Sequence, residues 1–300
     1  MNDYTIRAMD EKQTMRVFIA TTTNLVNAAT KIHSLSPVAA AALGRTLTAA
    51  SMLGQMMKGD KDTISIQLLG DGPISNVFAI SNSSGEVKGY VGNPLVDLPL
   101  KHDNKLDVGG AVGKNGRIVV IKDLGLKDPY VGQSNLVTGE VAEDLANYFL
   151  YSEQTPSAVN LGVLVDTDLS IKASGGYIVQ LLPDVLEEDI DLLEKNIQKS
   201  EPISSLIEKG YSPEDILEDI FGDFNMEILE ESKIKYKCDC SRDRMESALI
   251  SLGKEEITKL IEEDGQAEVV CHFCNKKHQF SKDDLKNLIR YWQYSIDIVY

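Results

Sequence analysis

The 300-residue chain places all four of its cysteines in two short motifs, Cys238-Asp239-Cys240 and Cys271-His272-Phe273-Cys274. Four thiolates in two close pairs match a tetrahedral zinc site, in which each pair chelates from one turn. The Cys-x-x-Cys spacing is usual in zinc knuckles, whereas Cys-x-Cys is less common and gives a tighter bite. The sequence therefore predicts one structural Zn²⁺ bound by Cys238, Cys240, Cys271 and Cys274.

Two other arrangements compete with a four-cysteine zinc site. Two structural disulfides would suit a secreted protein, but no apolar signal segment follows Met1, and a chain of this length can build a core without disulfides. Alternatively, His272 or His278 can replace one cysteine, because both lie close to the second motif. We expect His272 to face solvent, which leaves the four cysteines as the favoured ligands.

Charge and hydropathy argue against two classes of partner. The formal net charge of −16 opposes binding to a phosphate backbone, which needs clustered positive charge. No apolar run approaches the roughly 18 residues that a membrane span needs. We therefore expect neither nucleic acid nor a membrane as a partner, and we expect a cytoplasmic location.

Most of the negative charge lies in residues 184–231, where 16 Asp or Glu residues and 3 Lys give a local net charge of −13. Apolar residues recur there at helical spacing, and Ser212-Pro213-Glu214-Asp215 begins a further helix with a capping box. Helices this short are marginal alone, and like charges on them repel one another. We expect residues 184–232 to form an acidic helical linker that is metastable and poised to unfold.

Residues 1–183 alternate between strand and helix patterns, which predicts a mixed α/β domain and an α+β fold for the whole chain. The region shows no Ser-His-Asp/Glu or other catalytic spacing, and His33 and His102 stand alone, so we do not expect an enzyme. Ser36-Pro37 marks the start of a long helix, and Gly175-Gly176 is expected to form a turn. The expected strands are 4–8, 15–21, 64–68, 77–81, 86–92, 117–122, 160–165 and 177–182, with a helix at 141–149.

Residues 233–300 form the expected zinc-binding domain. Ser241 and Ser281 each cap a predicted helix, and a hairpin from Ala267 to Phe280 carries the second cysteine motif at its tip. A domain of roughly 60 residues has a small core, so bound zinc would supply much of its folding free energy, on the order of 10 kcal/mol at neutral pH. The last helix passes Trp292 and ends in an apolar tail, residues 296–300, which is a candidate partner surface.

A domain that folds only with zinc unfolds when zinc is lost, and oxidation removes zinc because a disulfide sulfur is a poor ligand. Unfolding of this domain, from Lys233 onward, would remove its expected packing against the apolar side chains Ile216, Leu217, Ile220 and Phe221 of the linker. Apolar faces under the linker would then open to solvent. Exposed apolar surface binds other apolar chains, so the logic leads from a thiol sensor to a holdase for unfolded protein. Basic residues around the first motif favour the oxidisable thiolates: Lys233, Lys235, Lys237, Arg242 and Arg244.

The whole chain resembles the 33 kDa heat-shock redox-regulated chaperone family. Cys238-Asp239-Cys240-Ser241 and Cys271-x-x-Cys274 match the family's two metal motifs in order and spacing. Ser174, before the double glycine, departs from the alanine expected there, away from the metal motifs. The N-terminal domain is matched by Gly70-Asp71-Gly72-Pro73, Tyr148-Phe149, Ser152-Glu153-Gln154-Thr155-Pro156-Ser157 and residues 175–183.

This resemblance implies a cytoplasmic bacterial holdase that prevents aggregation of unfolding proteins under oxidative stress. It implies that the reduced, zinc-bound form is inactive. Oxidation together with partial unfolding would form the disulfides Cys238–Cys240 and Cys271–Cys274, release zinc and activate the protein as a homodimer. All four cysteines are then both the metal ligands and the redox-active residues.

Two other functions fit a four-cysteine motif. A zinc-ribbon module that binds nucleic acid is opposed by the net charge of −16. A thiol–disulfide oxidoreductase would need its Cys-x-x-Cys motif at a helix N-terminus in a thioredoxin-like fold, whereas Cys271 and Cys274 are predicted to lie in a hairpin.

Overall fold

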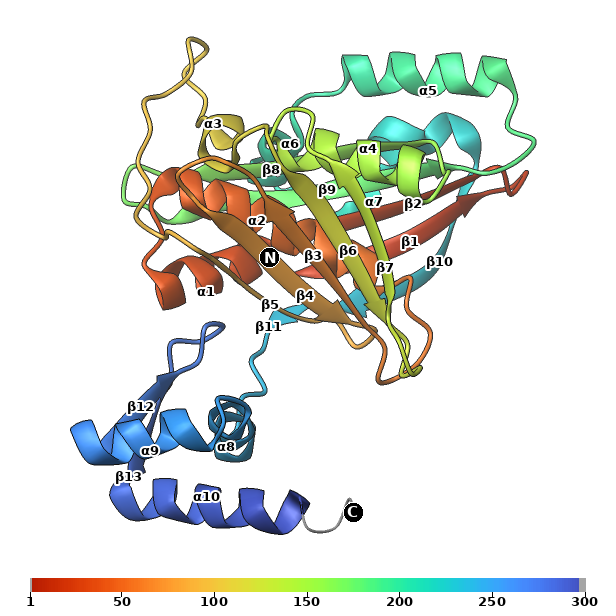
Figure 1. The fold of residues 1–300 in the computed structure, drawn as a ribbon. Coiled ribbons are helices and arrows are strands. Elements are labelled where there is room, and N and C mark those ends of the chain that lie inside the picture. The colour runs from red at the N-terminus through yellow and green to blue at the C-terminus, as the bar shows by residue number, and fades with distance from the viewer. Residues whose placement is uncertain (1, 297–300) are drawn as a thin grey trace. The chain divides into compact units, whose positions relative to one another are not determined.

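A computed structural model describes the backbone of residues 2–296 and the side chains of residues 2–289. Contacts divide the chain into two compact units, Met1–Lys237 and Cys238–Tyr300. The first unit contains two β-sheets with helices, and the second contains a hairpin with helices (Figure 1). This confirms the predicted α+β class. The side chain of Trp292 and the tail 297–300, the candidate partner surface, lie outside the described residues.

Sheet A joins the N-terminal strands to a strand from the acidic stretch. Its order is β10-β1-β2-β9-β8, with every neighbouring pair antiparallel. Strand β10 therefore pairs with β1 although the two lie near opposite ends of the first unit's sequence. The strands are β1 (Tyr4–Asp10), β2 (Met15–Thr21), β8 (Ser157–Val165), β9 (Ile171–Leu181) and β10 (Met226–Lys233).

Sheet B has the order β11-β5-β4-β3-β6-β7. The short strand β11 runs parallel to β5, and the other neighbours are antiparallel. The last residues before Cys238 are thus held at one edge of this sheet. The strands are β3 (Thr63–Leu69), β4 (Asn76–Asn82), β5 (Glu86–Val91), β6 (Arg117–Asp123), β7 (Tyr130–Asn135) and β11 (Lys235–Tyr236).

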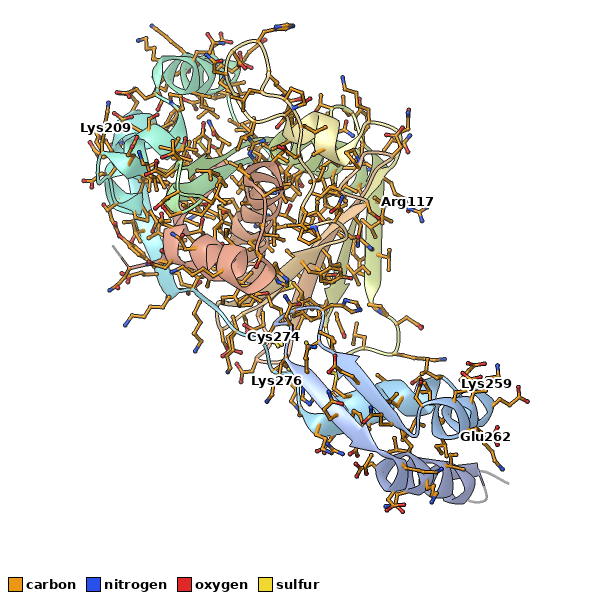
Figure 2. All side chains as sticks on the ribbon, turned by 90° about the vertical axis from the view of Figure 1, so that its left-hand side faces the viewer. Arg117, Lys209, Lys259, Glu262, Cys274 and Lys276 are labelled. Carbon is orange, nitrogen blue, oxygen red and sulfur yellow. The ribbon has the colours of Figure 1, made fainter. Side chains whose placement is uncertain are left out.

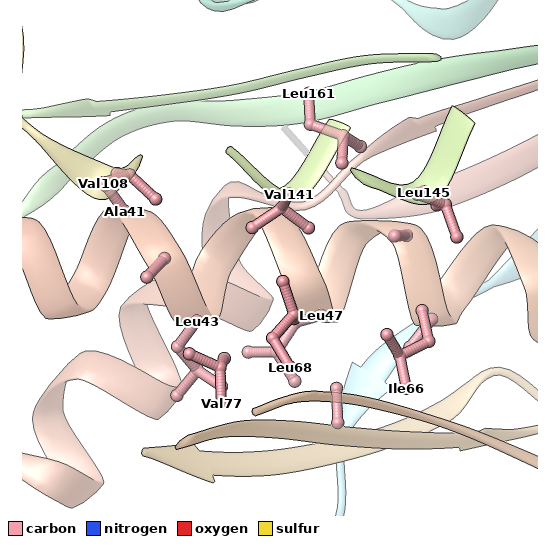
Figure 3. Close-up of a cluster of buried hydrophobic side chains, with 14 of the residues drawn as sticks. Ala41, Leu43, Leu47, Ile66, Leu68, Val77, Val108, Val141, Leu145 and Leu161 are labelled. Carbon is pink, nitrogen blue, oxygen red and sulfur yellow. The ribbon is translucent and has the colours of Figure 1, made fainter. Parts of the chain in front are cut away.

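Helix α2 (Pro37–Gly54) is buried between the two sheets. Ser36 caps it by accepting a hydrogen bond from the Ala39 N–H, as the Ser-Pro pair predicts. Leu43 and Leu47 point toward Leu68 and Val77 of sheet B, and α4 and β8 lie on the other side of the helix (Figure 3). The surrounding helices are α1 (Thr23–His33), α3 (Val108–Val112) and α4 (Val141–Ser152).

The acidic stretch covers the other face of sheet A with α5 (Glu187–Lys199), α6 (Ile203–Glu208) and α7 (Pro213–Phe221), followed by η1 (Gly222–Phe224). The predicted capping box of Ser212 and Asp215 is confirmed. We call the apolar layer beneath these helices the outer cluster. It contains Ile6, Ala8, Met15, Val17, Ile19, Ala173, Tyr177, Val179, Leu193, Ile203, Leu206, Ile207, Ile216, Leu217, Ile220 and Phe221.

The apolar face of α7 packs against a different partner from the one that the sequence predicts. Phe221 is 0% exposed, and its ring meets Tyr177 of β9 edge-on at 5.5 Å between centroids. Ile216 and Ile220 are also buried in the outer cluster. The expectation that the domain from Lys233 onward packs against this face is therefore wrong, because sheet A buries it.

Gly175 and Gly176 do not form a turn but lie inside β9, paired with β2 and β8. A Cβ on Gly175 would lie 2.3 Å from the Ala20 carbonyl oxygen, so the close strand spacing requires glycine there. Ser174, the departure from the family pattern, is buried beside them and its hydroxyl lies 2.8 Å from that of Thr22.

The second unit has a small hydrophobic core of its own. It comprises α8 (Arg242–Ser251), α9 (Lys254–Glu263), β12 (Gln266–Val270), β13 (Lys277–Ser281) and α10 (Lys282–Ile296). Few apolar side chains are buried among the described residues of this unit, which makes its stability marginal without a further cross-link. The buried members of this core are Leu249, Ile257, Ala267, Phe280, Leu285 and Leu288.

Candidate metal centre

The two cysteine motifs lie in two different turns of the second unit. Cys238 and Cys240 precede α8, whose first turn is capped by the Ser241 side chain. Cys271 and Cys274 lie in the turn that joins β12 to β13, and the Cys271 carbonyl accepts the Asn275 N–H at 2.8 Å. Figure 2 labels Cys274 and Lys276 in this turn.

The fold brings all four cysteine sulfur atoms into one cluster. Each Sγ lies within 4.8 Å of the other three, and the cysteines are free thiols. Cys238 Sγ is 3.6 Å from Cys271 Sγ, and Cys240 Sγ is 3.4 Å from Cys274 Sγ. Tetrahedral zinc with Zn–S bonds of about 2.3 Å places its sulfurs about 3.8 Å apart, so the donor set fits this ion with little movement.

The pKa shifts differ among the thiols of the cluster. Burial and the neighbouring sulfurs raise the pKa of Cys238 and of Cys240. Burial also acts on Cys271, but the Phe273 N–H, the Cys238 side chain and the Cys274 N–H outweigh it and lower the pKa of that thiol. Four adjacent thiolates repel one another, so all four are deprotonated together only when a bound cation compensates their charge.

The basic residues near the first motif are engaged elsewhere. Lys235 and Lys237 both pair with Glu86 on β5, at 3.6 and 2.5 Å. Arg244 pairs with Asp239 at 2.5 Å, and Arg242 pairs with Glu246 and Asp284. These ion pairs partly offset the charge of the four residues, and their expected effect on thiolate formation stays a prediction.

The two histidines near the second motif differ in their surroundings. His272 is exposed, as predicted, and is not one of the clustered groups. His278 on β13 is 8% exposed, and its Nε2 lies 3.9 Å from Cys240 Sγ. Sequence reasoning considered His278 only as a substitute ligand, whereas the structure places it beside a complete set of four sulfurs.

Residues 3–281 match the family described as Hsp33 protein. The chain belongs to the Hsp33 family. It is 51% identical to the 33 kDa chaperonin of Thermoanaerobacter sp. (strain X514), over 97% of this chain and 99% of that protein. The 33 kDa chaperonin of Clostridium beijerinckii is 48% identical over 96% of this chain and 99% of its own length.

A solved structure of an Hsp33 protein has the same fold. The crystal structure of the 33 kDa chaperonin from Thermotoga maritima superposes with a TM-score of 0.88 at 40% identity, covering 99% of this chain and 100% of that one. The resemblance identified from the cysteine motifs is thus confirmed, and the chain has the chaperone function of the Hsp33 family.

Arg242 contacts two further elements of the second unit from its place on α8. Its guanidinium donates to the Gln279 carbonyl of β13 at 2.9 Å and pairs with Asp284 in the first turn of α10 at 3.0 Å. Its Cζ also lies 4.5 Å from the centre of the Phe280 ring. Arg242 therefore joins the helix that follows Cys240 to the strand that follows Cys274, from a position next to the sulfurs.

We predict that Arg242→Met weakens this unit, because the methionine keeps the apolar stem but loses the hydrogen bond, both ion pairs and the ring contact. The expected loss is about 1–2 kcal/mol, since the side chain is partly exposed. Hydrogen exchange of β13 in the full-length reduced protein measures it. Arg244→Met is the matched control, because Arg244 lies on the same helix and pairs with Asp239 of the first cysteine motif. Equal exchange in the two variants would contradict the prediction.

Proposed function

We propose that this Hsp33 chain is a redox-regulated holdase that binds unfolding proteins and prevents their aggregation under oxidative stress. The observation that carries the proposal is the meeting of four sulfurs in a unit with a small core. Such a unit depends on its metal for folding, so a change in thiol oxidation state becomes a change in folding state.

Cys238, Cys240, Cys271 and Cys274 would hold one Zn²⁺ per chain in the reduced protein. The sulfur spacing and the need for a compensating cation both support zinc over an empty thiol cluster. When bound, zinc would cross-link the turn before α8 to the turn between β12 and β13. The reduced form would then be inactive because its second unit is folded.

Oxidation would convert the thiols of Cys238 and Cys240, and those of Cys271 and Cys274, to two disulfides. Each disulfide forms with loss of two protons and two electrons, and one hydrogen peroxide takes these up to give two waters. The short sulfur distances run between the motifs rather than within them. Pairing within each motif therefore follows from the family resemblance, and a disulfide map must test it against the crossed pairing.

Unfolding of the second unit would destabilise the linker through the segment of chain that joins them. Strand β11 has two residues and is separated from Cys238 by one residue, and β10 precedes β11 at the edge of sheet A. Lys237 N–H donates to the Val87 carbonyl at 3.0 Å, next to the first cysteine. Elements at a chain end fray first, so unfolding beyond Cys238 would loosen β11, then β10, then the helices above the outer cluster.

The exposed surface would bind unfolded or partly unfolded clients without catalytic turnover. We propose that the active form is a homodimer and that the protein acts in the cytoplasm, without nucleic acid or membrane as a partner. The charge of −16 supports the exclusion of nucleic acid. Among the described helices, none is long and apolar enough to cross a membrane.

Metal content, thiol count and chaperone activity should change together on one sample. The reduced protein is expected to carry one zinc and four free thiols and to leave an aggregating client unprotected. After hydrogen peroxide at elevated temperature, it should carry no zinc and no free thiol and suppress aggregation, with disulfides mapped by mass spectrometry. Full suppression by the reduced, zinc-loaded protein would refute redox control, and insulin reduction by the protein would favour an oxidoreductase instead.

A further inference from the structure

The cysteine sulfur atoms differ in the groups that surround them. Cys271 Sγ receives backbone N–H groups from Phe273 and Cys274, and Cys238 Sγ receives the N–H of Cys240. Burial raises the pKa of Cys240 most, and the other three cysteines are the neighbours that act on it next. N–H donors stabilise metal-bound thiolates by accepting part of their negative charge.

His278 is placed to provide this donor for Cys240. It pairs with Val269 in the β12–β13 hairpin, and its ring is buried, with Nε2 3.9 Å from Cys240 Sγ. Nε2 is not one of the atoms that all lie within 4.8 Å of one another, so the imidazole lies outside the tetrahedron of sulfurs. A metal-bound thiolate carries no proton and can only accept, so this hydrogen bond requires a proton on Nε2 of His278.

We propose that His278 is a positioning residue that donates its Nε2–H to Cys240 Sγ and so retains the Cys238-Asp239-Cys240 motif on the metal. This inference rests on the proposed zinc site. It assigns a role in metal retention to a residue that the four-cysteine motif does not contain. His278 would thereby set how readily the protein gives up its metal, and hence how much oxidant starts activation.

The test compares metal binding in the full-length reduced protein and three variants. His278→Phe keeps a buried ring without a donor, and His278→Gln restores an N–H close to the position of Nε2. His272→Phe makes the same change at the exposed histidine of the turn. Zinc affinity is measured by competition with a chromogenic chelator, and the Co²⁺-substituted proteins are compared by their sulfur-to-cobalt charge-transfer absorption.

Loss of an outer hydrogen bond to a metal ligand weakens metal binding by about 10–100-fold, and the long N···S distance favours the lower end. His278→Phe should therefore bind zinc about tenfold more weakly, and its charge-transfer band should move to lower energy because Cys240 becomes more electron-rich. His278→Gln and His272→Phe should remain within about threefold of the parent.

The outcomes separate this inference from the proposed function. A parent protein that binds no zinc would refute the zinc site itself. A parent that binds zinc, with His278→Phe unchanged in affinity and absorption, would overturn the role of His278 alone. Weaker affinity with an unmoved charge-transfer band would also overturn it, because the ring would then act through packing rather than through a hydrogen bond to sulfur.

Discussion

Cys271→Ser should give a chaperone that suppresses client aggregation without any oxidant. Cys271 is the most buried of the four cysteines, at 5% exposure, and its pKa is lowered whereas the pKa values of Cys238 and Cys240 are raised. Serine does not replace a thiolate as a zinc ligand, so the second unit loses its cross-link. Structural zinc contributes on the order of 10 kcal/mol to such a unit, far more than its core can replace.

The measurement combines zinc content, circular dichroism and an aggregation assay on fully reduced protein. We expect Cys271→Ser to hold less than a tenth of the parental zinc and to reach most of the activity of the oxidised parent. His272→Ser, in the same turn, should keep its zinc and stay inactive. A zinc-free Cys271→Ser protein that leaves the client unprotected would show that folding of the second unit does not restrain the chaperone.

Sequence reasoning located elements well where the signal is local. Ser36, Ser212 and Ser241 each accept a hydrogen bond from a backbone N–H of the helix that they were predicted to cap. Strands β1 and β2 were also predictable, because apolar residues recur at every second position along each of them. The cysteine cluster was predictable because zinc geometry restricts four thiolates to one arrangement, whichever way the intervening chain runs.

Pairing between segments that lie far apart in the sequence could not be predicted. Strand β10 is rich in glutamate, and its composition predicts part of a helical linker, yet it pairs with β1. Phe221, the last residue of α7, is buried against Tyr177 of β9, and no local pattern specifies this contact. The position of His278 beside Cys240 follows from the register of β12 and β13, which only the hairpin as a whole determines.

The negative charge of the linker destabilises its helices less than the sequence predicts. Glu187, Glu188 and Asp189 lie in the first turn of α5, where negative charge is favourable beside the positive end of the helix. Asp189 also pairs with Lys12, at 2.9 Å. Repulsion within the acidic stretch is therefore partly offset, and the proposed instability of this stretch would rest more on how its short helices are packed.

Phe221→Ala should activate the reduced, zinc-loaded protein by loosening that packing. The side chain is fully buried in the outer cluster, against Tyr177. Removing a buried phenylalanine ring costs about 3–5 kcal/mol, and 3 kcal/mol raises the open population of a two-state layer by roughly 100-fold. Residues 184–231 should lose hydrogen-exchange protection, as they should in the oxidised parent.

The matched control is Phe18→Ala, which removes the same ring from the other face of sheet A. Phe18 is 1% exposed and belongs to the core around α2, while its neighbours Val17 and Ile19 face the outer cluster. The two variants should lose similar stability, but only Phe221→Ala should bind clients with four thiols reduced and zinc retained. If both variants bind clients equally, or if Phe221→Ala exposes residues 184–231 and stays inactive, then uncovering sheet A is not what makes the chaperone active.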